Sequence, residues 1–508
     1  MKNASVSALS APARSAADVE GFFYAVAAIA ALAVLASLYV VAPAMHILAS
    51  PPLSYGVLMV VAVYFATHTL LRPQSALLYA PLFMVLATTI VPQSVPVWGN
   101  GAPRQYYFWA LGLFFITSAL VLRLPWRSLL RVGERRETPF FLTAFFAVCV
   151  AASFQGLRLG FGPSYVIRQL YGALLFVIYF YAVLVLPTRK SEIVGFLNIL
   201  KWFGIGASLY TIIRYAGAVK YADVGSFKWG LSIYCAMLAV YCMAEAATAK
   251  GLRNRLWLGL QATLLIANPV VFQARAATGV AAVAGGLAFV MLIRSKRVKT
   301  MVTTITLAVA VGAIVADFIA PIDEFLPHIG NAANLVPKNI LTQPSFVGRV
   351  NEVLGALRVM RVHPLLGAGL GSTLTFLSPG GATTVTMHPV DVGFAYVLSK
   401  LGLLGLVSFY GLVVSVLWHS GWPEPDLLHV AAFTLFVFCV AFMFSHPDML
   451  QFIVAGFAGM VCGLLHRAGS FKGREGGLAP RGRPCLRTPP PNLRAATHPP
   501  SSIGQKPW

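Results

Sequence analysis

Charged residues are scarce in this sequence, and acidic ones are scarcer than basic ones. Only 11% of the 508 residues are charged, with 16 Asp and Glu against 38 Lys and Arg. A soluble domain carries about a quarter charged residues, so a single soluble domain is excluded. Hydrophobic residues make up 58% of the chain, and apolar runs long enough to span a bilayer, roughly 20 residues, recur along most of it.

Cysteine is also rare, with six in the chain. Five fall inside apolar runs and Cys485 falls near the C-terminus. No two have metal-ligand spacing, so we interpret them as small core residues and expect neither disulfides nor a thiolate metal site. The histidines lack metal-ligand spacing as well. We therefore expect no metal and no cofactor.

The apolar runs predict an all-α fold, a polytopic membrane bundle of about 12–14 transmembrane helices with 14 the preferred count. Each run must satisfy its own backbone hydrogen bonds in lipid, which a helix does. The predicted spans are 20–43, 54–72, 76–92, 106–123, 139–155, 166–187, 195–216, 228–248, 255–272, 276–293, 301–320, 390–417, 428–446 and 449–466.

The basic residues alternate between loops in a way that predicts topology. Every second loop, beginning with the N-terminal segment that holds Lys2 and Arg14, is rich in Lys and Arg. Cytoplasmic loops carry this excess, so both termini are predicted to lie in the cytoplasm. The net charge of +22 is explained by topology, and no nucleic-acid partner is expected.

Four segments follow from this topology. Residues 1–320 hold the first eleven predicted spans, 321–389 form one large periplasmic loop, and 390–467 hold the last three spans. The segment 468–508 is rich in Pro, Gly, Arg and Ser. It has too little apolar content to fold, so it is predicted to be a disordered cytoplasmic tail.

Basic residues on the predicted outer side are unusual, because Lys and Arg are enriched in cytoplasmic loops. Arg275 lies in the short segment Gln273–Thr278 between two spans, and Arg349 lies in the large loop. Arginine donates two parallel hydrogen bonds to a phosphate, which lysine does not match. An anionic ligand therefore explains these residues. The alternative is an interfacial arginine that reaches lipid phosphate.

Within the large loop, residues 345–363 have helical periodicity. One face collects Phe346, Val350, Val353, Leu354 and Leu357. Arg349, Glu352 and Arg361 fall elsewhere on the helix. This pattern predicts an amphipathic helix lying on the membrane bundle and ending near His363–Pro364. It is either a structural lid or a lid that places Arg349 over a phosphate.

The glycines and histidines that follow this helix are candidates for ligand binding or catalysis. Gly367–Gly371 lacks the Lys-Ser/Thr of a nucleotide-binding loop, so a tight turn or close backbone approach is expected. His388, just before the next span, can take a proton from a hydroxyl at neutral pH. Otherwise it is a satisfied polar residue. Arg361, His363 and His446 are secondary candidates.

These pieces together resemble the O-antigen polymerase and O-antigen ligase superfamily of bacterial inner-membrane glycosyltransferases. The matching residues are Gly348–Arg349, His363 to Gly371, His388, and Gly402 to Leu406, within roughly 270–410. The family commonly has Asn after the loop His, where this chain has Pro389. An aromatic residue that often follows the loop Arg is missing here.

The resemblance implies transfer of a glycan from undecaprenyl diphosphate to an acceptor glycan or to lipid A core, without a metal. The donor diphosphate would meet Arg275 and Arg349, and the acceptor hydroxyl would meet His388. A polymerase is preferred over a ligase or a protein glycosyltransferase, and a chain-length regulator is a conceivable partner. A flippase or other transporter and a non-catalytic assembly protein are the remaining alternatives.

Overall fold

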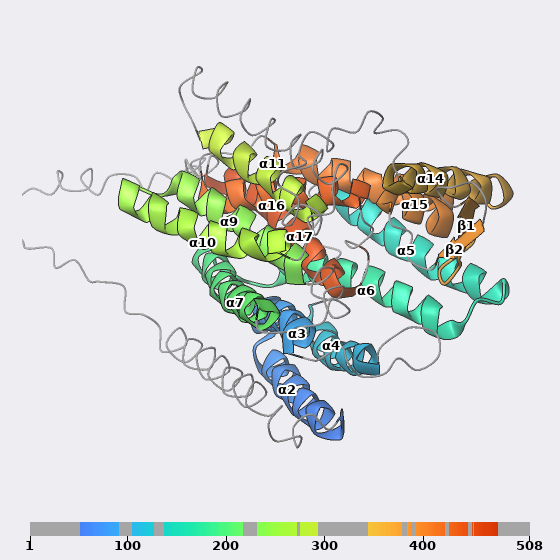
Figure 1. Ribbon diagram of the computed structural model, residues 1–508, viewed down its shortest axis with the longest axis horizontal. Helices are drawn as coiled ribbons and strands as arrows, with labels where there is room; N and C mark the ends of the chain where they lie inside the picture. The colour runs from blue at the N-terminus through green and yellow to red at the C-terminus, as the bar shows by residue number, and fades with distance from the viewer. Residues whose placement is uncertain are drawn as a thin grey trace, which may run out of the picture.

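The computed structural model describes residues 51–90, 104–125, 137–216, 231–271, 275–292, 344–377, 384–387, 392–421, 426–445, 450 and 452–475. Helices make up nearly all of this part (Figure 1). In chain order they are α2 (Pro51–Leu71), η2 (Pro73–Ser75), α3 (Ala76–Ile90), α4 (Arg104–Arg123), α5 (Glu137–Arg158), α6 (Pro163–Val185), α7 (Lys190–Ala216), α9 (Leu231–Thr248), α10 (Leu252–Val271), α11 (Arg275–Leu292), α14 (Pro344–Val362), α15 (Gly393–Ser420), α16 (Leu427–Ser445) and α17 (Phe452–Glu475).

Twelve of the predicted spans coincide with described helices, and the ranges 20–43 and 301–320 lie outside the described residues. Five helices, α5, α6, α7, α9 and α15, are long and apolar enough to cross a membrane. Four shorter apolar stretches lie in α2, α4, α16 and α17. The prediction of an all-helical membrane protein is therefore confirmed at this level. The count of 14 spans, the extent of the outer loop and the orientation stay predictions.

The centre of the bundle is α9. It packs against α7, α10, α11 and α16, and most of its side chains are buried. Helices that are hydrophobic on all sides belong in such central positions. A second packing centre joins α6 to α17 along their length, where Gly459 and Gly463 approach the backbone of α6.

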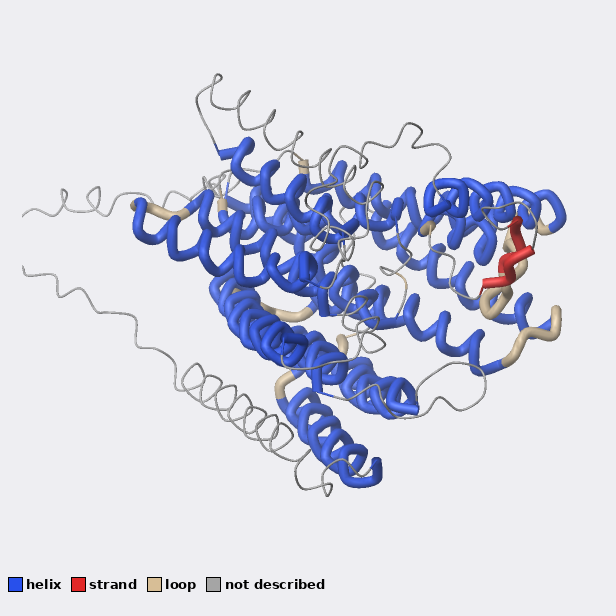
Figure 2. The backbone as a smooth tube through the Cα atoms, in the orientation of Figure 1, coloured by secondary structure: helices blue, strands red, loops and turns tan. Residues whose placement is uncertain are grey.

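A β-hairpin was not predicted. Strands β1 (Leu374–Leu377) and β2 (Thr384–Met387) pair antiparallel, with Leu374 opposite Met387, and Figure 2 shows the pair in red at one end of the molecule. Both strands are rich in Thr and in β-branched or aromatic residues, and Pro and Gly follow β1. Such features are typical of a β-hairpin, but the apolar runs alone did not predict one.

Helix α14 occupies the predicted range and ends directly before His363, but its orientation corrects a prediction. Val350, Leu354 and Leu357 are 42%, 47% and 37% exposed. An amphipathic helix lying on the bundle would turn this face inward. The face that packs against the bundle instead carries Glu352 and Ala356, which are 3% and 0% exposed. Small side chains let α14 approach its neighbours closely. Val350, Leu354 and Leu357 point away from them, whereas Val353 of the same predicted face is partly buried against the core.

The last helix also extends further than predicted. α17 continues to Glu475, past the expected beginning of the disordered tail at 468. The first proline after the span is Pro480, so every residue up to Glu475 retains the backbone donor that a helix needs. The rest of the predicted tail lies outside the described residues.

Candidate functional site at the α14 end

A buried carboxylate joins α14 to the beginning of α15. Glu352 Oε2 accepts a hydrogen bond of 3.1 Å from the backbone N–H of Val392, the N-cap residue of α15. Val392 has no side chain that can cap the helix. In a capping box, a Glu of the same helix bonds this N–H, and negative charge is favourable at a helix N-terminus. Glu352 supplies the same contact from another helix.

The chain that follows α14 meets α15 at a break. Gly402 has φ of +63°, so α15 consists of two helical halves. Leu403 and Leu404 donate backbone hydrogen bonds of 2.9 and 3.1 Å to the carbonyl oxygens of Pro364 and Leu365. Glycine adopts a positive φ readily. The break leaves the first N–H groups of the second half of α15 without acceptors in their own helix, and the chain after α14 supplies the carbonyl oxygens that accept them.

The segment Gly367–Gly371, here called the glycine turn, connects three helices. Ala368 N–H donates to Ser399 O of α15 at 2.8 Å, and Leu370 N–H donates to Ala152 O of α5 at 2.9 Å. Gly371 N–H donates to Gln169 Oε1 of α6 at 2.7 Å. The backbone of the turn therefore sets the spacing of α5, α6 and α15.

Side chains larger than hydrogen do not fit in this turn. A Cβ on Gly367 would lie 2.4 Å from Ser399 O, and one on Gly369 would lie 2.3 Å from Gly156 N. Both glycines also have positive φ, at +61° and +84°. The prediction of a tight turn with close backbone approach is confirmed.

The same contacts argue against phosphate binding by the glycine turn. Loops that cradle phosphate direct several unpaired backbone N–H groups at the ligand. Here the N–H groups of Gly367, Ala368, Leu370 and Gly371 already donate to acceptors of the protein. The rejection of a nucleotide-binding loop agrees with this geometry.

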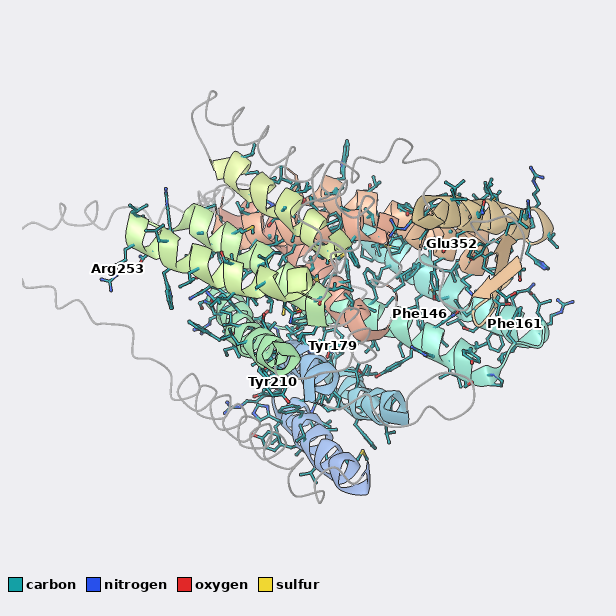
Figure 3. All side chains as sticks on the ribbon, in the orientation of Figure 1. Phe146, Phe161, Tyr179, Tyr210, Arg253 and Glu352 are labelled. Carbon is teal, nitrogen blue, oxygen red and sulfur yellow. The ribbon has the colours of Figure 1, made fainter. Side chains whose placement is uncertain are left out.

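Basic residues collect around the turn, at what we call the α14 end: α14, the hairpin, the end of α5 and the beginning of α6. Figure 3 labels Glu352 and Phe161 at this end and Arg253 at the opposite end of the molecule. The basic side chains described here are Arg158, Arg168, Arg349, Arg358 and Arg361. Glu352 is the one acidic residue described in these segments. The α14 end therefore has excess positive charge.

Three predicted site residues lie on or directly after α14. Arg349 is half-buried and precedes Glu352 by one helical turn, so it is near the end of α14 that is bonded to α15. Arg361 is exposed in the last turn. His363 is half-buried, and its carbonyl oxygen accepts the Gly367 N–H at 3.1 Å.

The remaining predicted residues are not brought together by the described structure. Arg275 is the first residue of α11, and α11 packs against α9 and α16. His388 and His446 lie outside the described residues. In the sequence, His388 directly follows β2 and precedes Val392 by four residues.

Sequence reasoning missed a buried lysine beside the glycine turn. Lys400 is fully buried in α15, and its Nζ has no hydrogen-bond partner within the described part of the chain. The Lys400 carbonyl carbon would lie 2.9 Å from a Cβ on Gly367, so its backbone is directly under the turn. The side chain is inaccessible, so we assign it no part in ligand binding.

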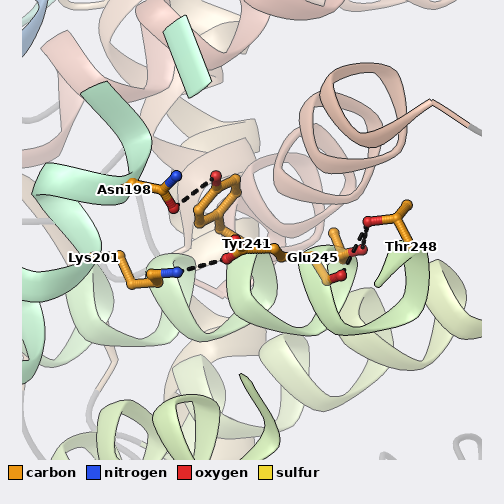
Figure 4. A network of polar contacts seen from close by, with 6 residues as sticks. Asn198, Lys201, Tyr241, Glu245 and Thr248 are labelled. Atoms are coloured by element: carbon orange, nitrogen blue, oxygen red, sulfur yellow. Dashed lines mark hydrogen bonds and ion pairs between the residues drawn. The ribbon is translucent and has the colours of Figure 1, made fainter. Parts of the chain in front are cut away.

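A second polar centre, shown in Figure 4, connects α7 to α9. Lys201 Nζ lies 2.6 Å from Glu245 Oε2 and 5.8 Å from the centre of the Tyr241 ring. Tyr241 OH donates to Asn198 Oδ1 at 3.2 Å. Lys201 is 4% exposed, and each charged group has an opposite partner. We interpret this network as a structural clamp between two helices.

No group of three or more His, Cys, Asp or Glu side chains in the described residues is arranged to hold a metal ion. The five cysteines described are buried and unpaired. Arginine is thus the functional group that the described part of the α14 end offers to an anion.

Comparison with known families gives one match. Residues 260–410 match the family model for O-antigen ligase. The matched range runs from within α10 to within α15, so it includes α11, α14, the hairpin, the glycine turn and the break at Gly402. No curated protein sequence matches the chain.

Proposed function

We propose that the protein is a glycan polymerase, because residues 260–410 match the family model for O-antigen ligase. The reaction is transfer of an undecaprenyl-diphosphate-linked glycan to an acceptor glycan at the periplasmic face of the inner membrane. The observation that carries the proposal is that the matched range contains α14 and the glycine turn, where the excess positive charge lies. A lipid diphosphate is an anion that such a surface favours.

The chemistry assigns a role to Arg275, Arg349 and His388. The acceptor hydroxyl attacks the anomeric carbon from the face opposite the diphosphate, which inverts that centre. The carbon–oxygen bond to the diphosphate breaks, and Arg349 and Arg275 stabilise the charge on the departing undecaprenyl diphosphate. His388 takes the proton of the hydroxyl. The donor bond already stores the energy of transfer, so no nucleotide is required.

Glu352 has a supporting role in this proposal. It lies one turn after Arg349, and it bonds the residue that begins α15. Arg349 precedes this carboxylate on α14, and His388 precedes Val392 by four residues in the sequence. Catalytic groups need to be held close to their productive positions, and we expect Glu352 to be a positioning residue.

Two alternatives are retained because they share observations with the polymerase. An O-antigen ligase would use the same donor and the same residues, with lipid A core as the acceptor, and the family match includes ligases. A flippase or transporter would need an ionisable group at membrane depth that binds a coupling ion. Glu245, the carboxylate described within an apolar span, is already paired with Lys201, which favours the enzyme.

The surface polysaccharide profile of a deletion strain tests the proposal. The strain is complemented with wild type, Arg275→Ala, Arg349→Ala or His388→Ala, and with Arg253→Ala as a matched control at the opposite end of the molecule. Each variant must be present in the membrane at wild-type level. Single repeats attached to lipid A without long chains would indicate a polymerase. Loss of all attached repeats, with accumulation of lipid-linked chains, would indicate a ligase. Normal profiles in all three site variants would refute the proposed site.

A further inference from the structure

The outward face of α14 is apolar. We call Val350, Leu354 and Leu357 the α14 stripe; they are 42%, 47% and 37% exposed. Residues three and four apart share one face of a helix, so these three form a continuous line. A face of this kind on a helix exposed to water is unfavourable, because each large apolar side chain gains free energy on leaving water.

The stripe lies opposite the surface by which α14 is attached. Glu352 and Ala356 are buried, and a Cβ on Gly355 would lie 3.3 Å from Phe376 Cβ of the hairpin. Helical residues are spaced by about 100°, which places Glu352 and Ala356 roughly half a turn from Leu354 and Gly355 about 100° from it. Neither α15 nor the hairpin therefore covers the stripe.

The stripe is continuous with the surface that α15 presents to lipid. Glu352 is bonded to Val392 and Pro364 to Leu403, so α14 and the part of α15 before Gly402 run in the same direction. Figure 1 shows the two helices side by side. Leu365 is 59% exposed and its carbonyl is bonded to Leu404, itself 44% exposed. Along α15 the exposed apolar residues continue with Val407 and Val414.

Charge at the edge of the stripe matches a bilayer surface. Arg358 and Arg361 are exposed in the last two turns of α14, beside Leu357. Helices that lie in a membrane interface combine a large apolar face with flanking Arg or Lys, whose long side chains reach lipid phosphates.

We propose that the α14 stripe is inserted into the lipid leaflet at this end of the bundle, with acyl chains against the stripe and lipid phosphates on Arg358 and Arg361. The occupant is bilayer lipid, because the stripe extends the lipid-facing surface of α15. Helix α14 is then a membrane-embedded helix, and the lid expected from the sequence does not open toward water. This inference rests on exposure and continuity, and it does not depend on which reaction the protein catalyses.

Collision accessibility of spin labels in the full-length protein tests this proposal. Leu354→Cys and Leu357→Cys are labelled in a Cys485→Ser background, since the five described cysteines are buried, and the protein is placed in nanodiscs of phosphatidylcholine and phosphatidylglycerol. Val414→Cys in α15, 60% exposed in the wild type, is the lipid reference. Thr386→Cys, on the exposed part of the hairpin, is the aqueous reference.

We expect labels at 354 and 357 to collide with oxygen as the Val414 label does, and several-fold less with a water-soluble nickel chelate than the Thr386 label does. Nickel accessibility equal to that at 386 would overturn the proposal, because the stripe would face water. Low accessibility to both reagents would overturn it too, because a protein segment or a second copy would cover the stripe. Leu365→Cys provides a further position if one variant fails to fold.

Discussion

Two regions of this molecule hold helices together by different means. At the α14 end, backbone N–H groups of the glycine turn donate to α5 and α15, and the carbonyl oxygens of Pro364 and Leu365 accept from α15. Between α7 and α9, the contact is made by side chains, with Lys201 and Glu245 in an ion pair. The first region depends on the absence of side chains and the second on their charge. Substitutions should therefore damage the two regions in different ways.

The largest effect is expected from Gly369→Ala. The new Cβ would lie 2.3 Å from Gly156 N, at a φ of +84°, and strain together with overpacking should cost about 4 kcal/mol or prevent folding. Gly160→Ala is the matched control, because Gly160 has the same φ and nothing within 4 Å. It should cost only about 1 kcal/mol. The measurement is thermal unfolding of both purified variants in nanodiscs. Equal losses of stability in the two variants would show that the close approach at Gly369 adds nothing to the cost of the substitution.

Glu245→Leu should have the next largest effect. It leaves the Lys201 ammonium buried without its partner, which costs about 3 kcal/mol. The double variant Lys201→Met, Glu245→Leu should regain most of that loss, because two apolar groups need no ionic partner. Thermal unfolding of the single and double variants measures this. A double variant as unstable as the single one would contradict the interpretation of the pair as a clamp.

Glu352→Ala should destabilise the protein by about 2 kcal/mol, the typical loss for a hydrogen bond made by a charged group. Glu352→Gln keeps an oxygen that can accept the Val392 N–H, so it should retain most of the stability. The two variants also separate positioning from folding. Glycan transfer should fall in Glu352→Ala even at temperatures where the protein is folded, and should recover in Glu352→Gln. Equal activity in both variants would remove Glu352 from the proposed function.

The smallest effect is expected at a surface ion pair. Lys190 Nζ lies 2.6 Å from Asp426 Oδ1, with side chains 48% and 37% exposed. Exposed pairs contribute little, so Lys190→Met should change the unfolding free energy by about 0.5 kcal/mol or less. The difference from wild type should shrink further at high salt. A loss of stability comparable to that of Glu245→Leu would mean that exposure to solvent does not determine how much the two ion pairs contribute to stability.

Sequence alone predicted the positions of most helices because apolar runs are local. It also predicted the glycine turn, since repeated glycines favour tight turns and close backbone approach. The ion pair was missed because Lys201 and Glu245 are 44 residues apart, and no local pattern joins them. The hairpin was missed because its strands are only four residues long.

The face of α14 was assigned the wrong way round for a physical reason. An apolar stripe at helical spacing indicates removal from water, and in a membrane protein lipid satisfies that condition as well as a protein core does. Small residues such as Gly355 and Ala356 were the better signal for the packed face. For the candidate site, the sequence placed Arg349 on a helix correctly. The proposed roles of Arg275 and His388 beside it concern tertiary contacts, which no local pattern encodes.

The bonding of the segment from Pro364 to Gly371 has a consequence for chain length. Five residues there are bonded in chain order, Pro364, Leu365 and Ala368 to α15, Leu370 to α5 and Gly371 to α6, so the register of the segment is fixed. Replacement of a side chain such as that of Leu366 changes no backbone bond. Insertion or deletion of a single residue would shift every later peptide away from its partner. Outside its glycines, this stretch should therefore tolerate substitutions far better than insertions or deletions, unlike most connections between helices.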